Sequence, residues 1–481
     1  MIKVVFVMPP YPFARTIGSK QAKKQIGLLP PLGVGYLSSF LEKNGPYNCS
    51  FVDAIAEQLD EKSTVERITE LKPDIIGISS FTTFIPNSAY SLVKKLKEYL
   101  KDTPIIMGGP HTTSFGETVL SDCPEIDYVL PGDAELSLFE LLEKLRQSRT
   151  PYDTQGLIYR KSSGEIVANP IGKIVENLDI LPFPARHIYN SELYEPLPSL
   201  SPKRPAMPMI TARGCPWGRC KFCYQGGKYA SPFRRRSPEN VIEEIKELIA
   251  KYKVKNIIFW DDNFCILPEW IEKFCFLIKS EKINLVWSVL SRVNTLTKEM
   301  LQQMAEAGCY SIQFGIESGN PEILKLIRKG HTLEQCRNAV KWAKEVGMET
   351  RAFFVLGFPT ETPEMSDETI KFACELNIDY VVFFSYYIAP GTPLAELALK
   401  EGQCYEFVGQ VYPSYLPNTY PDFETLLKKV QSAYRRYYLR PKYFLRTIER
   451  SVRRPNHTIN QVKAFKYWLG LAIKKWPKQK N

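Results

Sequence analysis

The sequence predicts two consecutive α/β domains, a doubly wound parallel sheet followed by a partial (β/α)6 barrel, with a basic helical extension at the C-terminus. Short apolar runs alternate with segments of helical period over residues 1–150, as in a parallel sheet covered by helices. The alternation resumes over 209–400, after a proline-rich stretch. Charge then changes abruptly, because residues 421–481 contain 16 Lys and Arg but only three acids.

Composition places the chain among soluble globular proteins. Its 481 residues suggest about three domains at ~150 residues each. The first ten residues have the pattern of a strand rather than of a signal peptide, and no stretch approaches the ~18 apolar residues of a spanning helix. Eleven cysteines without a secretion signal predict a reducing, cytoplasmic compartment. The net charge of +11 belongs to residues 421–481, so the remainder is close to neutral.

The first 150 residues are expected to form one domain with ligand-binding loops at the carboxyl ends of its strands. Strands are expected at 3–8, 49–52, 74–79, 104–107 and 127–130, with helices near 33–44, 58–71, 86–101 and 135–146. The candidate binding residues that follow or face strand ends are Gly33, Asp53, Ser79, Gly108, Gly109 and His111. Glycine lets the backbone approach a ligand closely. His111 is either a ligand contact or a loop histidine bonded to backbone.

Residues 151–208 are expected to connect the two domains. A hairpin is indicated by two short apolar runs that flank Lys161-Ser162-Ser163-Gly164. Residues 179–208 then contain seven prolines, which exclude a regular helix and predict an extended linker.

The central domain, 209–400, is expected to have polar side chains at the carboxyl ends of its strands. Strands are predicted at 209–212, 255–260, 285–290, 310–316, 350–356 and 379–385. The residues that follow them include Asp261, Asp262, Ser291, Arg292, Glu317, Ser318 and Gly357. Each one alone is explained equally well as a strand-end cap or an ion pair. Together, at successive strand ends, they indicate one site at the mouth of the barrel.

A loop with three cysteines follows the first strand of this domain. Cys215, Cys220 and Cys223 lie within nine residues, which suits a thiophilic metal centre. A structural zinc site needs a fourth ligand, and the closest histidines in sequence are the distant His187 and His331. An iron–sulfur cluster held by three thiolates keeps one iron open for another ligand. A zinc knuckle and a redox dithiol at Cys220 and Cys223 are the alternatives.

With the aromatic Phe222 before the last cysteine, this loop resembles that of the radical S-adenosylmethionine (SAM) enzymes. In that family three loop cysteines bind a [4Fe-4S] cluster, whose open iron chelates the amino and carboxylate groups of SAM. The spacing departs from the family pattern, since four residues rather than three separate Cys215 from Cys220. The resemblance implies Asp261 or Asp262 near the SAM amino group, Ser291 and Arg292 near its carboxylate, Glu317 and Ser318 near its ribose or methionine end, and Gly357 beside adenine.

The N-terminal domain is similar to the Rossmann-like cobalamin-binding domain that precedes the radical domain in one branch of this family. The order of Pro30-Pro31-Leu32-Gly33, Asp53, Gly108-Gly109-Pro110-His111 and Gly132-Asp133-Ala134-Glu135 carries this resemblance. It implies that the candidate residues, His111 among them, contact cobalamin. The Asp-x-His-x-x-Gly motif that supplies a lower cobalt ligand elsewhere does not occur. Cobalamin is therefore bound without a histidine ligand, or the fold is kept without its cofactor.

The resemblance implies an enzyme that cleaves SAM to a 5′-deoxyadenosyl radical. Cobalamin-dependent C-methylation of an unactivated carbon, in a lipid, isoprenoid or natural product, is the leading prediction. The alternative is a radical cyclase or carbon–carbon coupling enzyme with a cobalamin-free N-terminal domain. A non-catalytic metal or redox-binding protein is the alternative from a different class. A radical SAM enzyme also implies an external one-electron donor of flavodoxin or ferredoxin type.

The C-terminal region, 401–481, mixes basic and aromatic residues. That mixture is typical of a helix in a membrane interface, which would place the protein peripherally at the inner membrane face. Nucleic-acid binding uses the same residue types but is not expected here. The remaining reading is an ordinary helical extension that packs its aromatic residues on the barrel.

Overall fold

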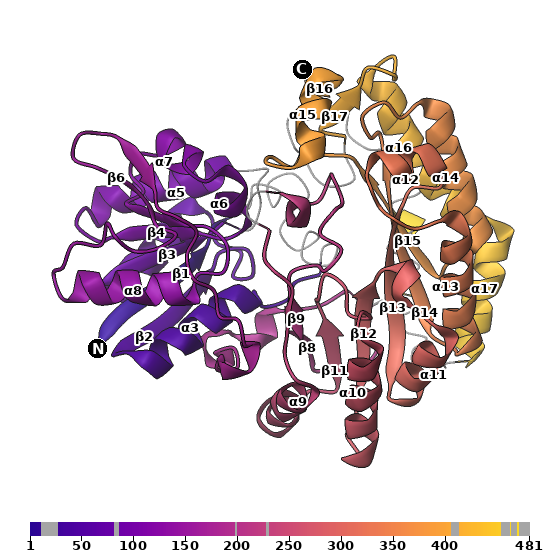
Figure 1. The fold of residues 1–481 in the computed structure, drawn as a ribbon, viewed down its shortest axis with the longest axis horizontal. Helices are drawn as coiled ribbons and strands as arrows, with labels where there is room; N and C mark the ends of the chain where they lie inside the picture. The colour runs from indigo at the N-terminus through magenta and orange to yellow at the C-terminus, as the bar shows by residue number, and fades with distance from the viewer. Residues whose placement is uncertain are drawn as a thin grey trace.

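The computed structural model describes residues 1–10, 27–80, 86–197, 200–227, 230–405 and 413–453, together with 462, 469 and 470. Two α/β domains lie next to each other, the N-terminal domain on the left of Figure 1 and the open barrel on the right. The predicted fold class is therefore confirmed.

The N-terminal domain is built on a seven-stranded sheet with the order β2-β1-β3-β4-β5-β6-β7. Its strands are β1 (Ile2–Met8), β2 (Tyr47–Asp53), β3 (Ile75–Ser79), β4 (Ile105–Gly108), β5 (Tyr128–Leu130), β6 (Ile158–Arg160) and β7 (Ile166–Ala168). Pairs from β2 to β5 are parallel, while β6 and β7 extend the sheet antiparallel as the predicted hairpin. The carboxyl ends of the five parallel strands therefore lie along one edge.

Helices cover both faces of this sheet. They are α3 (Leu32–Asn44), α4 (Glu61–Leu71), α5 (Pro86–Tyr99), α6 (Pro110–Phe115), α7 (Thr118–Asp122) and α8 (Glu135–Arg146). Alternate strand residues enter two separate apolar cores: Val5 and Val7 pack on one face, and Val4 and Phe6 on the other. Burial on both faces explains why these strands are continuous apolar runs in the sequence.

The connector runs back along the N-terminal domain before it enters the barrel. Tyr189 donates a hydrogen bond to the Pro31 carbonyl over 2.7 Å, and Tyr194 donates one to the Asp53 carboxylate over 2.9 Å. Gly35 has no room for a side chain because a Cβ would lie 2.7 Å from the Tyr189 hydroxyl oxygen. The connector is thus packed onto the first helix and is not a free tether.

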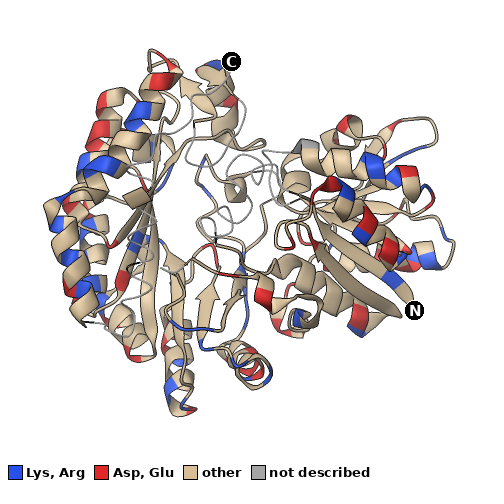
Figure 2. Cartoon of the chain, turned by 180° about the vertical axis from the view of Figure 1, so that it is seen from behind, with Lys and Arg blue, Asp and Glu red and all other residues tan. Residues whose placement is uncertain are grey.

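The second domain is an open barrel of six parallel strands in the order β15-β14-β13-β12-β11-β8. The strands are β8 (Ala206–Met209), β11 (Asn256–Phe259), β12 (Val286–Ser291), β13 (Cys309–Glu317), β14 (Glu349–Leu356) and β15 (Tyr380–Ser385). The outer helices are α9 (Pro238–Tyr252), α10 (Pro268–Ser280), α11 (Lys298–Glu306), α12 (Pro321–Leu326), α13 (Leu333–Glu345) and α14 (Pro363–Leu376). Figure 2 shows most of the charged residues on outer helices of the two domains.

The first barrel strand lies earlier in the chain than the sequence pattern predicted. It ends at Met209, although a strand was expected at 209–212. The Asp261 carboxylate accepts hydrogen bonds from the backbone N–H groups of Thr211 and Ala212 over 2.6 and 2.7 Å. These N–H groups are therefore bonded to a side chain, and the chain leaves the sheet toward the cysteine loop.

The C-terminal region closes the free edge of the barrel with helix α16 (Phe423–Tyr438). The Tyr438 hydroxyl accepts from the Val381 N–H and donates to the Val381 carbonyl, and Tyr434 makes the same pair of bonds to Phe383. Two tyrosines one helical turn apart thus satisfy edge groups that a seventh strand would otherwise bind. The aromatic residues of this part of the tail belong to the barrel core.

The remaining C-terminal elements are α15 (Pro393–Lys400), the hairpin β16 (Gly402–Cys404) and β17 (Tyr415–Pro417), and α17 (Pro441–Arg453). Part of the basic and aromatic C-terminal region, residues 464–476, falls outside the described residues except for Leu469 and Gly470. Within the part of the chain that is described, no helix is both long and apolar enough to cross a bilayer.

Candidate functional site

The cysteine loop projects from a short antiparallel pair of strands, β9 (Ala212–Arg213) and β10 (Arg234–Arg235). Gly214 begins the loop with φ +78°, and a side chain there would collide with the Ser231 and Pro232 carbonyls. Gln225 follows the last cysteine and donates to the Asp262 carboxylate over 2.8 Å. The ends of the loop are therefore fixed by the backbone, and its last turn is tied to the end of β11.

The three thiols differ in their surroundings. Cys220 is buried, whereas Cys215 and Cys223 are partly exposed. Burial raises the pKa of Cys220 against the opposing charges of Lys329 and Arg292, and it raises the pKa of Cys223 to about 12. Without a metal these two thiols stay protonated at neutral pH. The nearby Arg292 guanidinium is suited to compensate the negative charge that thiolate ligands bring to a metal centre.

No three His, Cys, Asp or Glu side chains in the described part of the chain converge on one point as ligands of a single ion. In a cubane cluster each thiolate binds a different iron atom, so the thiols surround the cluster without meeting at one point. Cys215, Cys220 and Cys223, on a single loop, supply one thiol for each of three irons.

Arg292 links the cysteine loop to the barrel. Its Nη1 lies 3.8 Å from Cys220 Sγ, and its guanidinium carbon lies 4.6 Å from the ring centroid of Trp217. It also donates to the Lys329 carbonyl. The position predicted for it, at the end of the third barrel strand, therefore brings it against the cysteine loop.

Glu317 ends β13 in a strained conformation beside the same loop. Its φ is +71°, which is rare for a residue with a Cβ, and it follows a bulge in the pairing with β14. Lys329 Nζ donates to Glu317 Oε1 over 2.8 Å, and both side chains are about nine-tenths buried. Burial alone lowers the pKa of Lys329, but the negative charges of Glu317 and Cys220 together outweigh burial, so the pKa is raised. Sequence reasoning missed Lys329, which lies in a loop 12 residues after Glu317.

Other predicted strand-end residues are already bonded within the protein. Asp261 anchors Thr211 and Ala212, as described above. Ser291 donates to Asn263 over 3.0 Å, and the Ser318 hydroxyl lies 3.0 Å from that of Thr369. These groups hold the strand ends in place. Any contact they make with a cofactor stays a prediction.

Asp262 is an exposed residue, unlike its buried neighbour Asp261. Partial desolvation nevertheless raises its pKa, as expected in a concave site. Gln225, which binds it, keeps its own Oε1 buried and without a partner in the described structure. Gly357 is required for another reason: with φ +79°, a Cβ there would lie 3.0 Å from Leu426 of α16.

In the N-terminal domain, open space marks the candidate site. Among the described residues, no atom lies within 4 Å of a Cβ built at Gly33, in the first turn of α3, and the same holds for Gly132. Gly109 has φ +98°, and a side chain there would lie 2.8 Å from the Ser80 carbonyl oxygen. Ser79 and Gly108 are partly exposed at the ends of β3 and β4. Asp53 is buried and accepts from the N–H groups of Ile55 and Ala56.

His111 lies in the interior. It is 1% exposed, its Nε2 lies 2.8 Å from the Tyr90 hydroxyl, and its ring packs on Phe115 with centroids 4.7 Å apart. Burial lowers its pKa to about 4, so the ring is neutral. His111 was expected either to contact a ligand or to be bonded to backbone. In the structure it is bonded within the protein, but its partner is the Tyr90 side chain and not backbone.

Four charged side chains join the two domains at the base of the cysteine loop. Arg213 donates to Glu135 over 2.6 Å and lies 3.5 Å from Asp133, which also pairs with Arg234. Arg213 and Arg234 are register partners in the β9–β10 pair. Burial raises the pKa of Asp133, but the two arginines outweigh it and hold it below its usual value. We call these four residues the interdomain clamp.

Comparison with known proteins agrees with this division of the chain. Residues 209–373 match the radical SAM superfamily and residues 26–142 match the B12 binding domain. An uncharacterised methyltransferase of Pyrococcus horikoshii is 34% identical over 455 residues, covering 93% of this chain and 95% of that protein. The chain belongs to the cobalamin-binding branch of the radical SAM superfamily.

Further relatives and solved structures support the same fold. The anaerobic magnesium-protoporphyrin IX monomethyl ester cyclase of Rubrivivax gelatinosus is 29% identical, covering 96% of this chain and 82% of that protein. The radical SAM methyltransferase TsrM from Kitasatospora setae, solved with cobalamin and a [4Fe-4S] cluster, has a TM-score of 0.68 over 89% of this chain and 82% of that one, at 18% identity. That likeness concerns the fold.

The chain is therefore a radical SAM enzyme of the cobalamin-dependent, methyltransferase-like type. Its cofactors are SAM, a [4Fe-4S] cluster and cobalamin, as predicted. Of the residues around the site, sequence reasoning missed Arg213, Arg234, Lys329 and Gln225. The two arginines flank the cysteine loop on both sides, and that placement is the sequence signal that could have identified them.

Proposed function

We propose that this enzyme methylates an unactivated carbon atom in a cobalamin-dependent radical reaction. The observation that carries the proposal is the interdomain clamp. It ties the open, glycine-lined edge of a cobalamin-binding domain to both ends of a three-cysteine loop. A methyl donor and a radical generator must act on the same substrate carbon, and a fixed distance between their sites serves that need.

The cofactors supply a 5′-deoxyadenosyl radical and a transferable methyl group, and the chain supplies position and charge. We assign Cys215, Cys220 and Cys223 as the cluster ligands, with Arg292 compensating their charge. Asp262 and the unpartnered Gln225 carbonyl oxygen suit the SAM amino group, because both accept hydrogen bonds. Gly33 and Gly132 leave the space that a large corrin ring needs against backbone, while Gly109 adopts a φ of +98° that suits glycine.

We propose further that the substrate is largely apolar. The inner face of the barrel carries the partly exposed side chains of Leu290, Phe353, Val355 and Phe384. Phe353 and Phe384 stack with ring centroids 5.9 Å apart. Relatives named for bacteriochlorophyllide d methylation and hopanoid methylation, at 29% and 24% identity, favour the same substrate class.

A radical cyclase is the second candidate, because the cyclase of Rubrivivax gelatinosus covers nearly the whole chain. The two functions differ in what they make from SAM. Methylation of a carbon releases 5′-deoxyadenosine and S-adenosylhomocysteine in equal amounts. Cyclisation releases 5′-deoxyadenosine alone and needs no methyl donor.

The test is anaerobic reconstitution with iron, sulfide and hydroxocobalamin, followed by metal counts and the visible spectrum. Iron together with stoichiometric cobalt, and both SAM products after reduction, is the expected result. Iron without cobalt, with 5′-deoxyadenosine only, would favour the cyclase. Zinc in place of iron would contradict both candidates.

We also propose peripheral contact with an anionic membrane through helix α17. Its outward face exposes Leu445, Ile448 and Val452, which are 68%, 62% and 74% accessible. Lys442 is exposed at its first turn. An apolar stripe beside basic residues is typical of an interfacial helix, and an apolar substrate would be reached there.

A further inference from the structure

We propose that Trp217, Arg219, Lys325 and Arg328 form the docking surface for an acidic one-electron carrier protein. We call these four residues the basic port. The proposal rests on the proposed function, because a cluster on the cysteine loop must be reduced from outside before SAM is cleaved. One electron leaves the reduced carrier and enters the cluster, and no atom or proton is transferred.

Trp217 is fixed at the rim of the cysteine loop. Its Nε1 donates to the Arg328 carbonyl over 3.0 Å, and its ring lies so close to Gly330 that a side chain there would collide with it. The guanidinium carbon of the exposed Arg219 lies 5.5 Å from the ring centroid. A partly exposed, immobilised indole of this kind is a rigid anchor for a partner surface.

A single side chain, that of Arg292, contacts both the Trp217 indole and the Cys220 thiol. Arg292 lies between them, with its guanidinium carbon 4.6 Å from the Trp217 centroid and its Nη1 3.8 Å from Cys220 Sγ. The contact series Trp217–Arg292–Cys220 therefore joins the surface to a predicted cluster ligand. Electron transfer slows steeply with distance, so a carrier docked on Trp217 is well placed to reduce the cluster.

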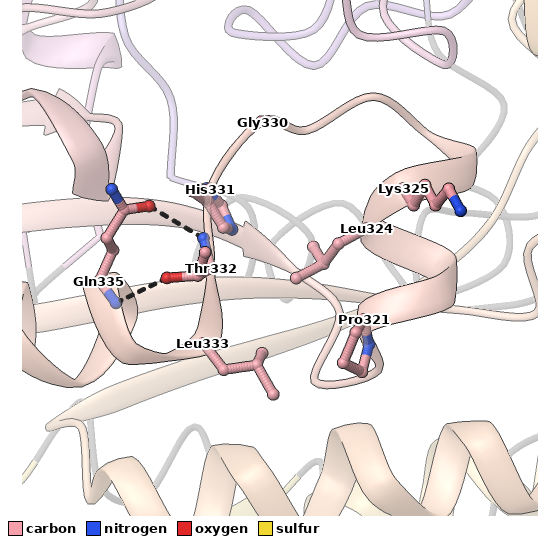
Figure 3. A pocket seen from close by; sticks show the side chains of 8 residues that line it. All are labelled: Pro321, Leu324, Lys325, Gly330, His331, Thr332, Leu333 and Gln335. Carbon is pink, nitrogen blue, oxygen red and sulfur yellow. Dashed lines mark hydrogen bonds between the residues drawn. The ribbon is translucent and has the colours of Figure 1, made fainter.

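Charge and shape on this face suit an acidic partner. Arg219, Lys325 and Arg328 are exposed, and none has a carboxylate partner within the described part of the chain. Lys325 also lines a cavity of about 620 Å³, and Figure 3 shows Leu324, His331 and Leu333 around it with Lys325 on α12. Thr332 and Gln335 cap α13 at its wall.

The acids beside these residues are fewer than the cations. The two exposed acids that adjoin the cavity-lining residues in sequence are Glu322 and Glu334, and the exposed Arg219, Lys325 and Arg328 outnumber them by one. The buried Arg292 adds a further positive charge, while Lys329 is neutralised by Glu317. Such a field attracts an acidic carrier and accelerates its association at low salt.

The double substitution Lys325→Glu/Arg328→Glu tests the port in the full, reconstituted chain. A purified, reduced flavodoxin serves as the acidic carrier, and dithionite serves as a small reductant that needs no docking. We expect the flavodoxin concentration for half-maximal 5′-deoxyadenosine formation to rise at least about fivefold, with a smaller effect at high salt. Flavodoxin binding in biolayer interferometry weakens in parallel, whereas dithionite-driven formation stays at the wild-type rate.

The matched control, Lys94→Glu/Lys101→Glu, makes the same charge change at exposed residues on α5 and the turn after it. It should leave flavodoxin dependence unchanged. Equal flavodoxin dependence and binding in wild type, port variant and control would overturn the docking surface. Lys325→Gln/Arg328→Gln, with an intermediate loss expected, guards against a folding defect, as does equal iron content. Absence of 5′-deoxyadenosine from the wild type with dithionite would instead overturn the proposed function, and the port with it.

Discussion

The carboxyl-end edges of the two sheets prepare their sites in opposite ways. In the barrel the edge is crowded with polar side chains that are bonded to one another, such as Asp261 to Thr211 and Glu317 to Lys329. In the N-terminal domain the edge at Gly33 and Gly132 is bare backbone beside open space. A small charged cofactor needs groups fixed in advance, whereas a broad, flat ring needs side chains to be absent.

Removal of a thiol from the cysteine loop should abolish cluster binding at the barrel edge and leave the edge of the N-terminal domain unaffected. We expect Cys215→Ala, Cys220→Ala or Cys223→Ala to lower iron retention and 5′-deoxyadenosine formation by more than about 100-fold, because two thiolates do not hold a cubane. Cobalt binding should be unchanged. The exposed Cys404 provides the control as Cys404→Ala. A loop variant with full turnover would contradict the assignment of the ligands.

A bulky side chain at Gly33 should block the other edge. Gly33→Phe extends into space where the described part of the chain has no atom within 4 Å of the Cβ position, so the described fold has room for it. We expect cobalt content after reconstitution to fall about tenfold or more, with iron unchanged. Gly33→Ala removes the glycine without filling the space and should bind cobalt as the wild type does. Equal cobalt in the two variants would show that cobalamin binds elsewhere.

The clamp variant Asp133→Asn should uncouple the two edges. It leaves Arg213 and Arg234 without their shared carboxylate, and because Asp133 is partly exposed and Arg213 keeps Glu135, the loss costs about 1–3 kcal/mol. Calorimetry should show the two domains unfolding in more widely separated transitions. Asp127→Asn is the control, since Asp127 pairs with Lys97 inside the N-terminal domain. The same separation in both variants would exclude a specific role for the clamp.

Buried titratable groups should give the two domains opposite pH responses. Burial lowers the pKa of His111 to about 4, so its contribution to stability is present above its unfolded pKa of about 6.5 and is lost as pH falls toward 4. Burial raises the pKa of Glu361 to about 7, so its contribution is present below about 4.5 and is lost as pH rises toward 7.

Between about pH 4.5 and 6.5, the free energy of unfolding of the N-terminal domain should therefore increase with rising pH, while that of the barrel should decrease. Each change is at most about 3 kcal/mol. Calorimetry across this range measures both changes. His111→Phe should flatten only the first response, and Glu361→Gln only the second. If the stabilities of the two domains changed in the same direction with pH, the prediction of opposite responses would be refuted.

The weakest expected effect concerns the outer face of α17. Leu445→Ser/Ile448→Ser should reduce cosedimentation with anionic liposomes about tenfold, because each lost aliphatic side chain removes apolar area from the interface. Iron and cobalt contents should not change. Leu399→Ser, at an exposed position of α15, is the control. Unchanged liposome binding would remove the membrane hypothesis.

Sequence reasoning reached the fold because strand and helix periods are strong in both domains, as in β1 and α9. The position of the cysteine loop followed from local spacing. Local spacing did not reveal the partners of the site residues, since Lys329 meets Glu317 and Asp133 meets Arg234 only through tertiary packing. The end of β8 was misplaced because a distant carboxylate, Asp261, takes the N–H groups that a strand would use.

The tyrosine hydroxyls on the edge strand β15 also bear on solubility. An exposed strand edge recruits other strands, and natural proteins cover or charge such edges to avoid aggregation. Tyr434 and Tyr438 occupy the N–H and carbonyl groups of Phe383 and Val381 without presenting a new edge of their own. A chain truncated before Asp422 would expose those groups beside apolar side chains. We therefore expect it to self-associate through β15, however intact its catalytic domain remains.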